Sequence, residues 1–164
     1  MFREDYVRRM IEQATAVVTA ILGLTRIDRY PEALAEVDSA LQRFLGLRLG
    51  LVAALPASEL VAMLRWGEHL DIGKVVVLAE LLQAEGDIYG AQHQAAEAQA
   101  RYCKALEVLL EGAFEAEQYL PAMQPHVAAL QHRLDTATTP PDLLEWLAHY
   151  HASVAALPAD GLAD

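Results

Sequence analysis

The stretch that decides the fold runs from Val77 to Glu111 and reads VLAELLQAEGDIYGAQHQAAEAQARYCKALEVLLE. Apolar residues recur at three- and four-residue steps on both sides of the turn around His93, which is typical of two amphipathic helices. The sequence predicts one helix over about 70–89, capped by Asp71, although the valines at 75–77 would also tolerate a strand. A second helix is expected over 95–111. Together they form an antiparallel hairpin.

The other helices follow the same apolar period and are bounded by glycine, proline and capping residues. They are 2–22, ended by Gly23; 31–46, opened by Pro31; about 58–66, capped by Ser58; a segment restarting near Pro125 with Val127, Leu130 and Leu134 as its buried stripe; and a last helix from Pro140 or Pro141 to Leu157. No long strand-like alternation interrupts this pattern. The sequence therefore predicts an all-α fold of antiparallel helical hairpins.

Length and composition favour one compact domain. The chain has 164 residues, of which 54% are hydrophobic and 21% charged, enough apolar surface for a sizeable core. We expect a single helical domain over 1–157, with an acidic helical pair at 112–157 and a frayed tail at 158–164.

Charge excludes one class of partner. The net charge is −11, and residues 111–164 carry eight acids against Arg133 alone. Nucleic acid binding needs clustered cations that displace counterions from phosphates, so we do not expect it. We expect no membrane segment either, since no apolar run reaches 18 residues, and the N-terminus lacks the features of a secretory signal. A cytoplasmic location is the resulting expectation.

A spacing within the central stretch resembles the tetratricopeptide repeat (TPR), a helical hairpin of about 34 residues. Counted from Gly86, the family has an aromatic residue at three, a small residue at twelve, an aromatic at sixteen and a small residue at nineteen. This chain has Tyr89, Ala98, Tyr102 and Ala105 at those positions. Gly86 and Ala98 would let the helices approach closely, with the tyrosines filling the groove around them.

The resemblance is incomplete along the chain. The segment 31–46 is a weaker echo of the same repeat, and Glu85 stands where the family usually has leucine. The resemblance therefore implies an irregular TPR-like array. The order of the opening MFREDYVRRMIEQ, the YPEAL hairpin and the central helix also resembles a family of small uncharacterised bacterial proteins, over roughly residues 1–111, which implies no known activity.

Histidines concentrate in the acidic C-terminal third, which raises the question of a metal site. The candidate ligands are His126, His132, Glu145 and His149. Glu145 and His149 are four residues apart and could share a helix face, whereas His126 and His132 are six residues apart, which places them on different faces. No HExxH or paired ExxH motif is present, so solvated histidines are the alternative.

The cysteine and the two tryptophans each have a structural explanation as an alternative to a functional one. Cys103 lies beside Lys104, which could lower a thiol pKa, but no histidine is close in sequence to act as its base, so an inert thiol is expected. Trp66 and Trp146 stand at helical spacing, which favours core packing or an exposed contact patch. The sequence predicts no catalytic residue and no cofactor.

The leading functional hypothesis is a non-enzymatic protein-interaction module that holds a peptide or partner helix in a concave groove. Its candidate groove residues lie on the first helices of the hairpins and are Gln13, Thr15, Gln83, Asp87 and Tyr89. A second hypothesis is a homodimer that packs through the wide apolar face of helix 2–22. A small-ligand or metal-binding protein is the third.

Overall fold

The computed structural model describes residues 2–158, with only the backbone described at residues 2 and 3. Apart from Pro158, the predicted tail lies outside them. The elements are α1 (Phe2–Arg26), α2 (Tyr30–Leu45), α3 (Leu49–Ala54), α4 (Ala57–Met63), β1 (Arg65–Trp66), β2 (His69–Leu70), α5 (Ile72–Ala91), α6 (Ala95–Glu115), the 3-10 turn η1 (Glu117–Tyr119), α7 (Gln124–Arg133) and α8 (Pro141–Ala155). The predicted all-α class is confirmed.

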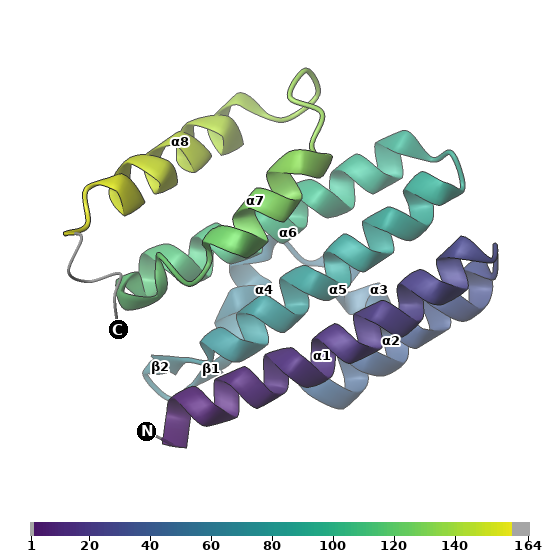
Figure 1. Cartoon of the computed structure of the whole chain (residues 1–164), viewed down its shortest axis with the longest axis horizontal. Helices are drawn as coiled ribbons and strands as arrows, with labels where there is room; N and C mark the ends of the chain where they lie inside the picture. The colour runs from purple at the N-terminus through teal and green to yellow at the C-terminus, as the bar shows by residue number, and fades with distance from the viewer. Residues whose placement is uncertain (1, 159–164) are drawn as a thin grey trace.

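The long helices form two layers (Figure 1). In the first layer α1, α5 and α7 run parallel: a Cβ added at Gly73 would lie 3.5 Å from Cα of Val7, and further along the same pair Thr15 lies beside Glu80. The second layer holds α2, which runs antiparallel to α1, and α6, which runs antiparallel to α5. Within the part of the chain described here, α3 and α4 are inserted between α2 and α5, and α4 packs against α6.

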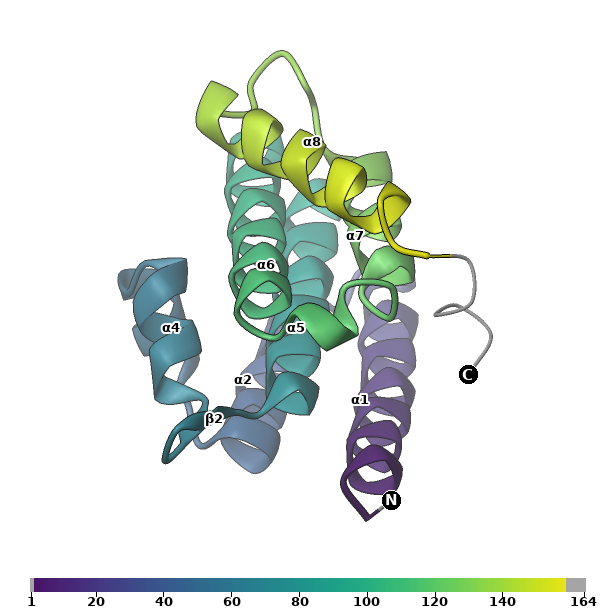
Figure 2. The ribbon, with the colours of Figure 1, turned by 90° about the vertical axis from the view of Figure 1, so that its left-hand side faces the viewer.

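The acidic C-terminal part, which forms α7 and α8, covers one side of the central hairpin α5–α6. Both α7 and α8 pack against α6, and α8 crosses its outer side (Figure 2). The Tyr150 hydroxyl is buried and donates to the Leu120 carbonyl at 2.6 Å, which anchors α8 to the segment before α7. Burial raises the pKa of Tyr150 to about 12, so its hydroxyl remains a donor at neutral pH.

The central helix α5 is buried on nearly every side. It packs against α1, α2 and α6, which explains the almost continuous apolar run at its start. Asp71 caps it as predicted, since Asp71 Oδ1 accepts from the Lys74 backbone N–H at 3.2 Å. The valines at 75–77 are helical and all three are buried.

Glycines set the distance between α5 and α6. A Cβ at Gly86 would lie 2.5 Å from Cε1 of Tyr102, and one at Gly90 would lie 3.9 Å from Cβ of Ala98. Ala105 is buried in the same interface. Four of the five predicted packing residues are thus buried in the hairpin. The fifth, Tyr89, is half-buried beneath the Arg101 guanidinium, 5.3 Å from its ring centre.

Three predicted helix boundaries are wrong. Gly23 does not end α1, because Thr25 is buried beyond it and the chain turns only at Asp28, where φ is 58°. Ser58 does not cap α4, because Pro56 precedes the helix directly and Ser58 lies in its first turn. That helix also ends at Met63 rather than near residue 66.

Several short elements were not predicted. Arg65–Trp66 pairs with His69–Leu70 as a two-stranded antiparallel ladder around Gly67, whose φ is 63°. The helix α3 was also missed. Finally, α6 continues past the predicted end at residue 111 and runs to Glu115. A Cβ at Gly112 would lie 2.7 Å from Cγ1 of Val75, so this glycine packs against α5 and does not end the helix.

Candidate functional site

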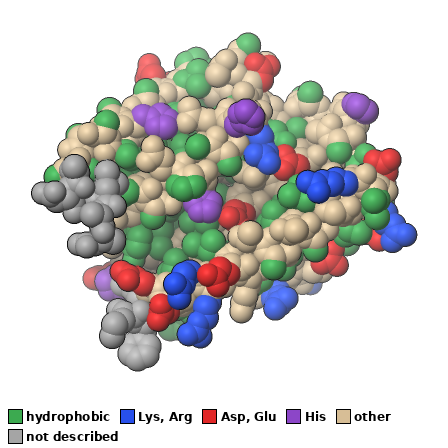
Figure 3. Space-filling view, in the orientation of Figure 1, with side chains coloured by type: hydrophobic (Ala, Val, Ile, Leu, Met, Phe, Trp, Pro, Cys, Tyr) green, Lys and Arg blue, Asp and Glu red, His purple; other side chains and the backbone are tan. Residues whose placement is uncertain are grey.

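The parallel helices α1, α5 and α7 form a surface that we call the inner face. The first and last of them stand apart, and α5 lies between and behind them (Figure 1). Figure 3 shows hydrophobic side chains gathered in the hollow between α1 and α7, with acidic and histidine side chains at its edge. The α5 side of this hollow carries two carboxylates, Glu80 and Asp87, which contact α7 in different ways.

Asp87 joins three helices. Arg133 of α7 donates from Nε to Asp87 Oδ1 at 2.9 Å and from Nη2 to Oδ2 at 3.2 Å, while the Tyr102 hydroxyl of α6 donates to Oδ1 at 2.5 Å. Burial first, and then the Asp87 carboxylate, raise the pKa of Tyr102, so its hydroxyl keeps the proton it donates. Asp87 therefore holds α7 against the central hairpin.

Glu85 stands where the TPR pattern usually has leucine, and this acidic residue is only 2% exposed. Arg101 of α6 donates from Nε to Glu85 Oε1 at 2.9 Å. Burial raises the pKa of Glu85, and Arg101 acts in the opposite direction by stabilising the ionised form. The charged pair replaces the apolar contact expected of leucine and joins α5 to α6.

Glu80 is the least satisfied polar group on the inner face. Its Oε1 lies 3.4 Å from Nδ1 of His126 on α7, and its buried Oε2 has no hydrogen-bond partner among the described residues. The Thr15 hydroxyl of α1 lies beside the carboxyl but donates to the Ile11 carbonyl at 2.8 Å. An acceptor without a donor is costly once it is removed from water. Glu80 is thus an acceptor at the junction of α1, α5 and α7.

The environment of this pair changes its protonation. Burial raises the pKa of Glu80 from 4.5 to about 7, with the Thr15 hydroxyl acting weakly in the opposite direction. Burial also lowers the pKa of His126. Below about pH 7 the proton of this pair is therefore held by Glu80 rather than by His126.

The raised pKa of Glu80 predicts how stability varies with pH. Between pH 4.5 and about 7 the folded chain keeps a proton that the unfolded chain has lost, so the free energy of unfolding falls as pH rises. The variant Glu80→Gln lacks this loss. We expect it to exceed the wild type by about 2 kcal/mol at pH 8.5 and to match it within about 0.5 kcal/mol at pH 4.5 in urea unfolding.

The matched control is Glu36→Gln, which changes an exposed carboxylate on α2. It should change stability by less than about 0.5 kcal/mol at both pH values. Equal stabilities of wild type and Glu80→Gln at pH 8.5 would mean that solvent reaches Glu80 and that its acceptor is hydrated.

The predicted groove residues divide between positions open to solvent and positions engaged by other side chains. Gln13 and Thr15 are exposed on α1, and Gln83 is half-buried on α5. Asp87 is engaged by Arg133, and Tyr89 is covered by Arg101. Both Thr15 and Asp87 lie at the hollow, since Thr15 is beside Glu80 of α5 and Asp87 is bonded to Arg133 of α7. Glu80 was missed, although a carboxylate inside the run VVVLAELL is a signal of a buried charge.

The four candidate metal ligands are not gathered at one place. His126 faces Glu80, His149 stacks on Phe114 with ring centres 5.1 Å apart, and His132 and Glu145 are exposed. Within residues 2–158, no group of three or more His, Cys, Asp or Glu side chains is placed to hold a metal ion. The metal hypothesis therefore has no geometric support from the part of the chain that is described.

Cys103 lines an open cavity of about 900 Å³ between α6 and the connection from α7 to α8. His93 lines the same cavity, but no hydrogen bond joins the two among the described residues. Burial, and then Glu107, raise the pKa of the Cys103 thiol, which opposes the thiolate that a nucleophile needs.

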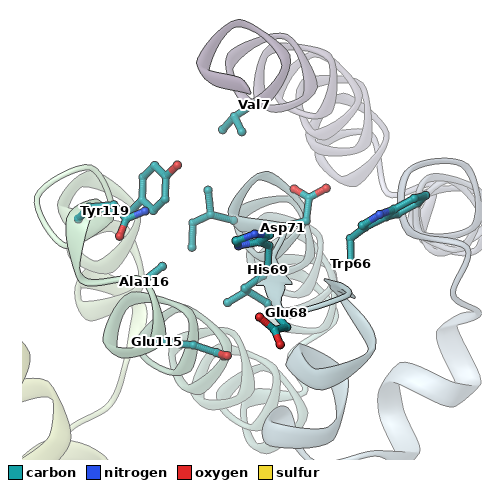
Figure 4. Close-up of a pocket in the computed structure, with 11 residues that line it drawn as sticks. Val7, Trp66, Glu68, His69, Asp71, Glu115, Ala116 and Tyr119 are labelled. Carbon is teal, nitrogen blue, oxygen red and sulfur yellow. The ribbon is translucent and has the colours of Figure 1, made fainter. Parts of the chain in front are cut away.

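A smaller pocket of about 360 Å³ lies where α1 and α5 begin, and we call it the N-terminal pocket. Figure 4 shows Tyr119 and Trp66 on opposite sides, with His69 and Asp71 between them and Val7 of α1 above. Glu68 and Glu115 complete its acidic lining. The pocket thus combines aromatic and acidic groups at one end of the inner face.

Comparison with known proteins adds no relative: no protein-family model, no curated protein and no solved structure matches this chain. Over residues 2–158, no helix combines the length and apolar character that crossing a membrane requires.

Proposed function

We propose that this chain is a non-enzymatic, TPR-like protein-interaction module whose inner face binds a segment of a partner protein. The observation that carries the proposal is Glu80, whose buried Oε2 lacks a donor within the described residues at the hollow between α1 and α7. That oxygen is itself closed to solvent, but the Glu80 side chain as a whole is 18% exposed, so a donor from a bound segment would reach the carboxyl group from the hollow. The parallel arrangement of α1, α5 and α7 is the arrangement that such arrays use to present a concave surface.

The other carboxylates of this part of α5 support a binding role over a catalytic one. Asp87 is bonded to Arg133 and Tyr102, and Glu85 to Arg101. These pairs lock helices together instead of holding a nucleophile against a base. They stabilise the scaffold on which a partner would dock.

A homodimer through α1 has less support than a different partner. The breadth of its apolar face favours a second copy, but α1 packs on both α2 and α5 inside one chain. Met10, Ala14 and Ile21 are buried by those contacts. The intramolecular neighbours therefore account for most of that face.

The test compares proteins captured from native lysate by the wild type and by two variants. Thr15→Arg places a guanidinium beside Glu80 at the edge of the hollow, whereas Ser39→Arg makes the same charge change on the exposed side of α2. We expect at least one protein to be captured by the wild type and by Ser39→Arg but not by Thr15→Arg. With that partner purified, calorimetry should show affinity reduced at least about tenfold by Thr15→Arg alone.

Two outcomes would contradict the proposal. In one, every protein captured by the wild type is captured equally by Thr15→Arg. In the other, light scattering gives a wild-type dimer that Thr15→Arg dissociates, which would make the inner face an interface between copies of this chain.

A further inference from the structure

The lining of the N-terminal pocket has an unusual balance of charge. Three carboxylates contribute to it, from Glu68, Asp71 and Glu115, and no Lys or Arg is among its described lining residues. Its lining also has an aliphatic part, with Val7 and Ile72 from the two helices that begin there. A ligand with an aliphatic stem and a positive end would match both parts of this lining.

The aromatic residues of the pocket narrow the choice of cation. Trp66, at the tip of the two-stranded ladder, is 84% exposed, the highest value for a large hydrophobic residue among the described residues. Tyr119 stands on the opposite side (Figure 4). A planar guanidinium can stack on aromatic faces and bind carboxylates through two nitrogens, whereas an ammonium is a hydrated point charge.

The chain itself places a guanidinium against this wall. Arg65, next to Trp66, forms an ion pair with Glu115 across the gap between the ladder and the end of α6. Glu115 is thereby neutralised, and Glu68 and Asp71 remain as carboxylates for a second cation. Asp71 already uses Oδ1 to cap α5, so its carboxylate is held in a fixed orientation.

We propose that the N-terminal pocket binds the arginine side chain of a partner segment that lies along the inner face. This inference rests on the proposed function, because the pocket lies at one end of that face. Ile72 and Glu80 are eight residues apart on α5, about 12 Å along the helix. An extended partner chain covers that distance in about four residues. The partner segment would therefore carry its arginine about four residues from the group that donates to Glu80.

The test uses acetyl-arginine amide as probe and acetyl-citrulline amide as its neutral isostere. In nitrogen–proton correlation spectra of the whole chain, the arginine probe should shift the Trp66 indole signal and the amides of residues 66–72 and 115–119. We expect saturation at about millimolar concentration, as suits a single side chain. The citrulline probe at the same concentration should leave these signals in place.

Variants then assign the contacts. Glu68→Gln with Asp71→Asn should weaken binding of the arginine probe at least about fivefold, and Asn retains the cap of α5. Glu68→Gln alone is a surface change that preserves the fold and should act in the same direction. Trp66→Ala should weaken binding about threefold. Glu36→Gln on α2 controls for net charge and should leave the affinity unchanged.

The pocket assignment is overturned if the two probes shift the same signals equally, or if an acetyl-lysine amide binds as tightly as the arginine probe. It is also overturned if no signal saturates. These results leave the loss of captured proteins in Thr15→Arg untouched, so they refute the arginine pocket separately from the interaction module. Conversely, saturable arginine binding without any effect of Thr15→Arg would refute the module and leave an isolated cation site, which contradicts the inference as stated.

Discussion

Gly86→Ala is expected to lower the free energy of unfolding by about 2 kcal/mol, although alanine is the better helix former. A Cβ at this position would lie 2.5 Å from Cε1 and 2.8 Å from Cδ1 of Tyr102. The ring cannot swing away, because it is buried and its hydroxyl is bonded to Asp87. Overpacking of about 3 kcal/mol then exceeds the gain of about 1 kcal/mol in helix propensity.

The matched control is Gly23→Ala, the same substitution inside another long helix. Beyond the helix's own backbone and its chain neighbours, no atom lies within 4 Å of a Cβ at Gly23, so the propensity gain is unopposed and stability should rise by up to about 1 kcal/mol. Urea unfolding of both variants measures the difference in sign. If Gly86→Ala were as stabilising as Gly23→Ala, the close approach of α5 to α6 would be wrong.

A second background tests the partner named in this prediction. With Tyr102→Leu the ring is absent, and Gly86→Ala should then be less destabilising by at least about 1 kcal/mol. Additive effects of the two changes would mean that Gly86 contacts something other than Tyr102.

The central hairpin was predictable because its information is local. Gly86 and Tyr102 are sixteen residues apart in the sequence, and the turn between their helices is short, so small and large residues at fixed spacing meet across the interface. Asp71 and Pro141 were recognisable for the same reason, since each acts on the helix that it opens. Such signals depend on neighbours in sequence and not on tertiary structure.

The hollow of the inner face was not predictable in the same way. Glu80 meets Thr15 from 65 residues earlier and His126 from 46 residues later, and no periodicity within α5 encodes either contact. The groove prediction therefore included Thr15 and Asp87, which lie on two helices of this hollow, but left out Glu80. It also assigned Asp87 to a partner, whereas Arg133 already binds it.

Predictions from local sequence signals were wrong at positions where tertiary contacts decide the structure. Gly23 has the appearance of a helix terminator, but burial of Thr25 carries α1 past it. The ladder around Gly67 is too short for an alternating pattern to reveal it. The four candidate metal ligands shared a region of the sequence without sharing a place in the fold, since α7 and α8 direct them to different surroundings.

Asp87→Ala is expected to lower the free energy of unfolding by about 3 kcal/mol, the largest effect among the polar residues of the inner face. The change leaves the half-buried Arg133 guanidinium and the buried Tyr102 hydroxyl without their shared acceptor. Removing one member of a buried, hydrogen-bonded charge pair destabilises more than the pair itself stabilises, because the other charge remains desolvated. Urea unfolding at pH 7 measures the loss.

The loss should also be localised, since Asp87 is the acceptor that joins α7 to the hairpin. Amide hydrogen exchange in Gln124–Arg133 should accelerate more than in α2, because α7 has few other contacts with α5. Asp38→Ala makes the same substitution on α2, where Asp38 Oδ1 accepts from the Leu49 N–H at 2.8 Å, and it should leave exchange in α7 unchanged.

A double-mutant cycle separates the ion pair from the rest of the network. Asp87→Asn with Arg133→Met should be more stable than the sum of the single changes predicts, by about 1–2 kcal/mol, because each single change strands one partner and the double change strands neither. Strict additivity would show that Arg133 is solvated independently of Asp87. In that case apolar contacts such as those of Val127 and Leu130 would hold α7 against the hairpin, and the inner face would owe its third wall to packing instead of to this charge pair.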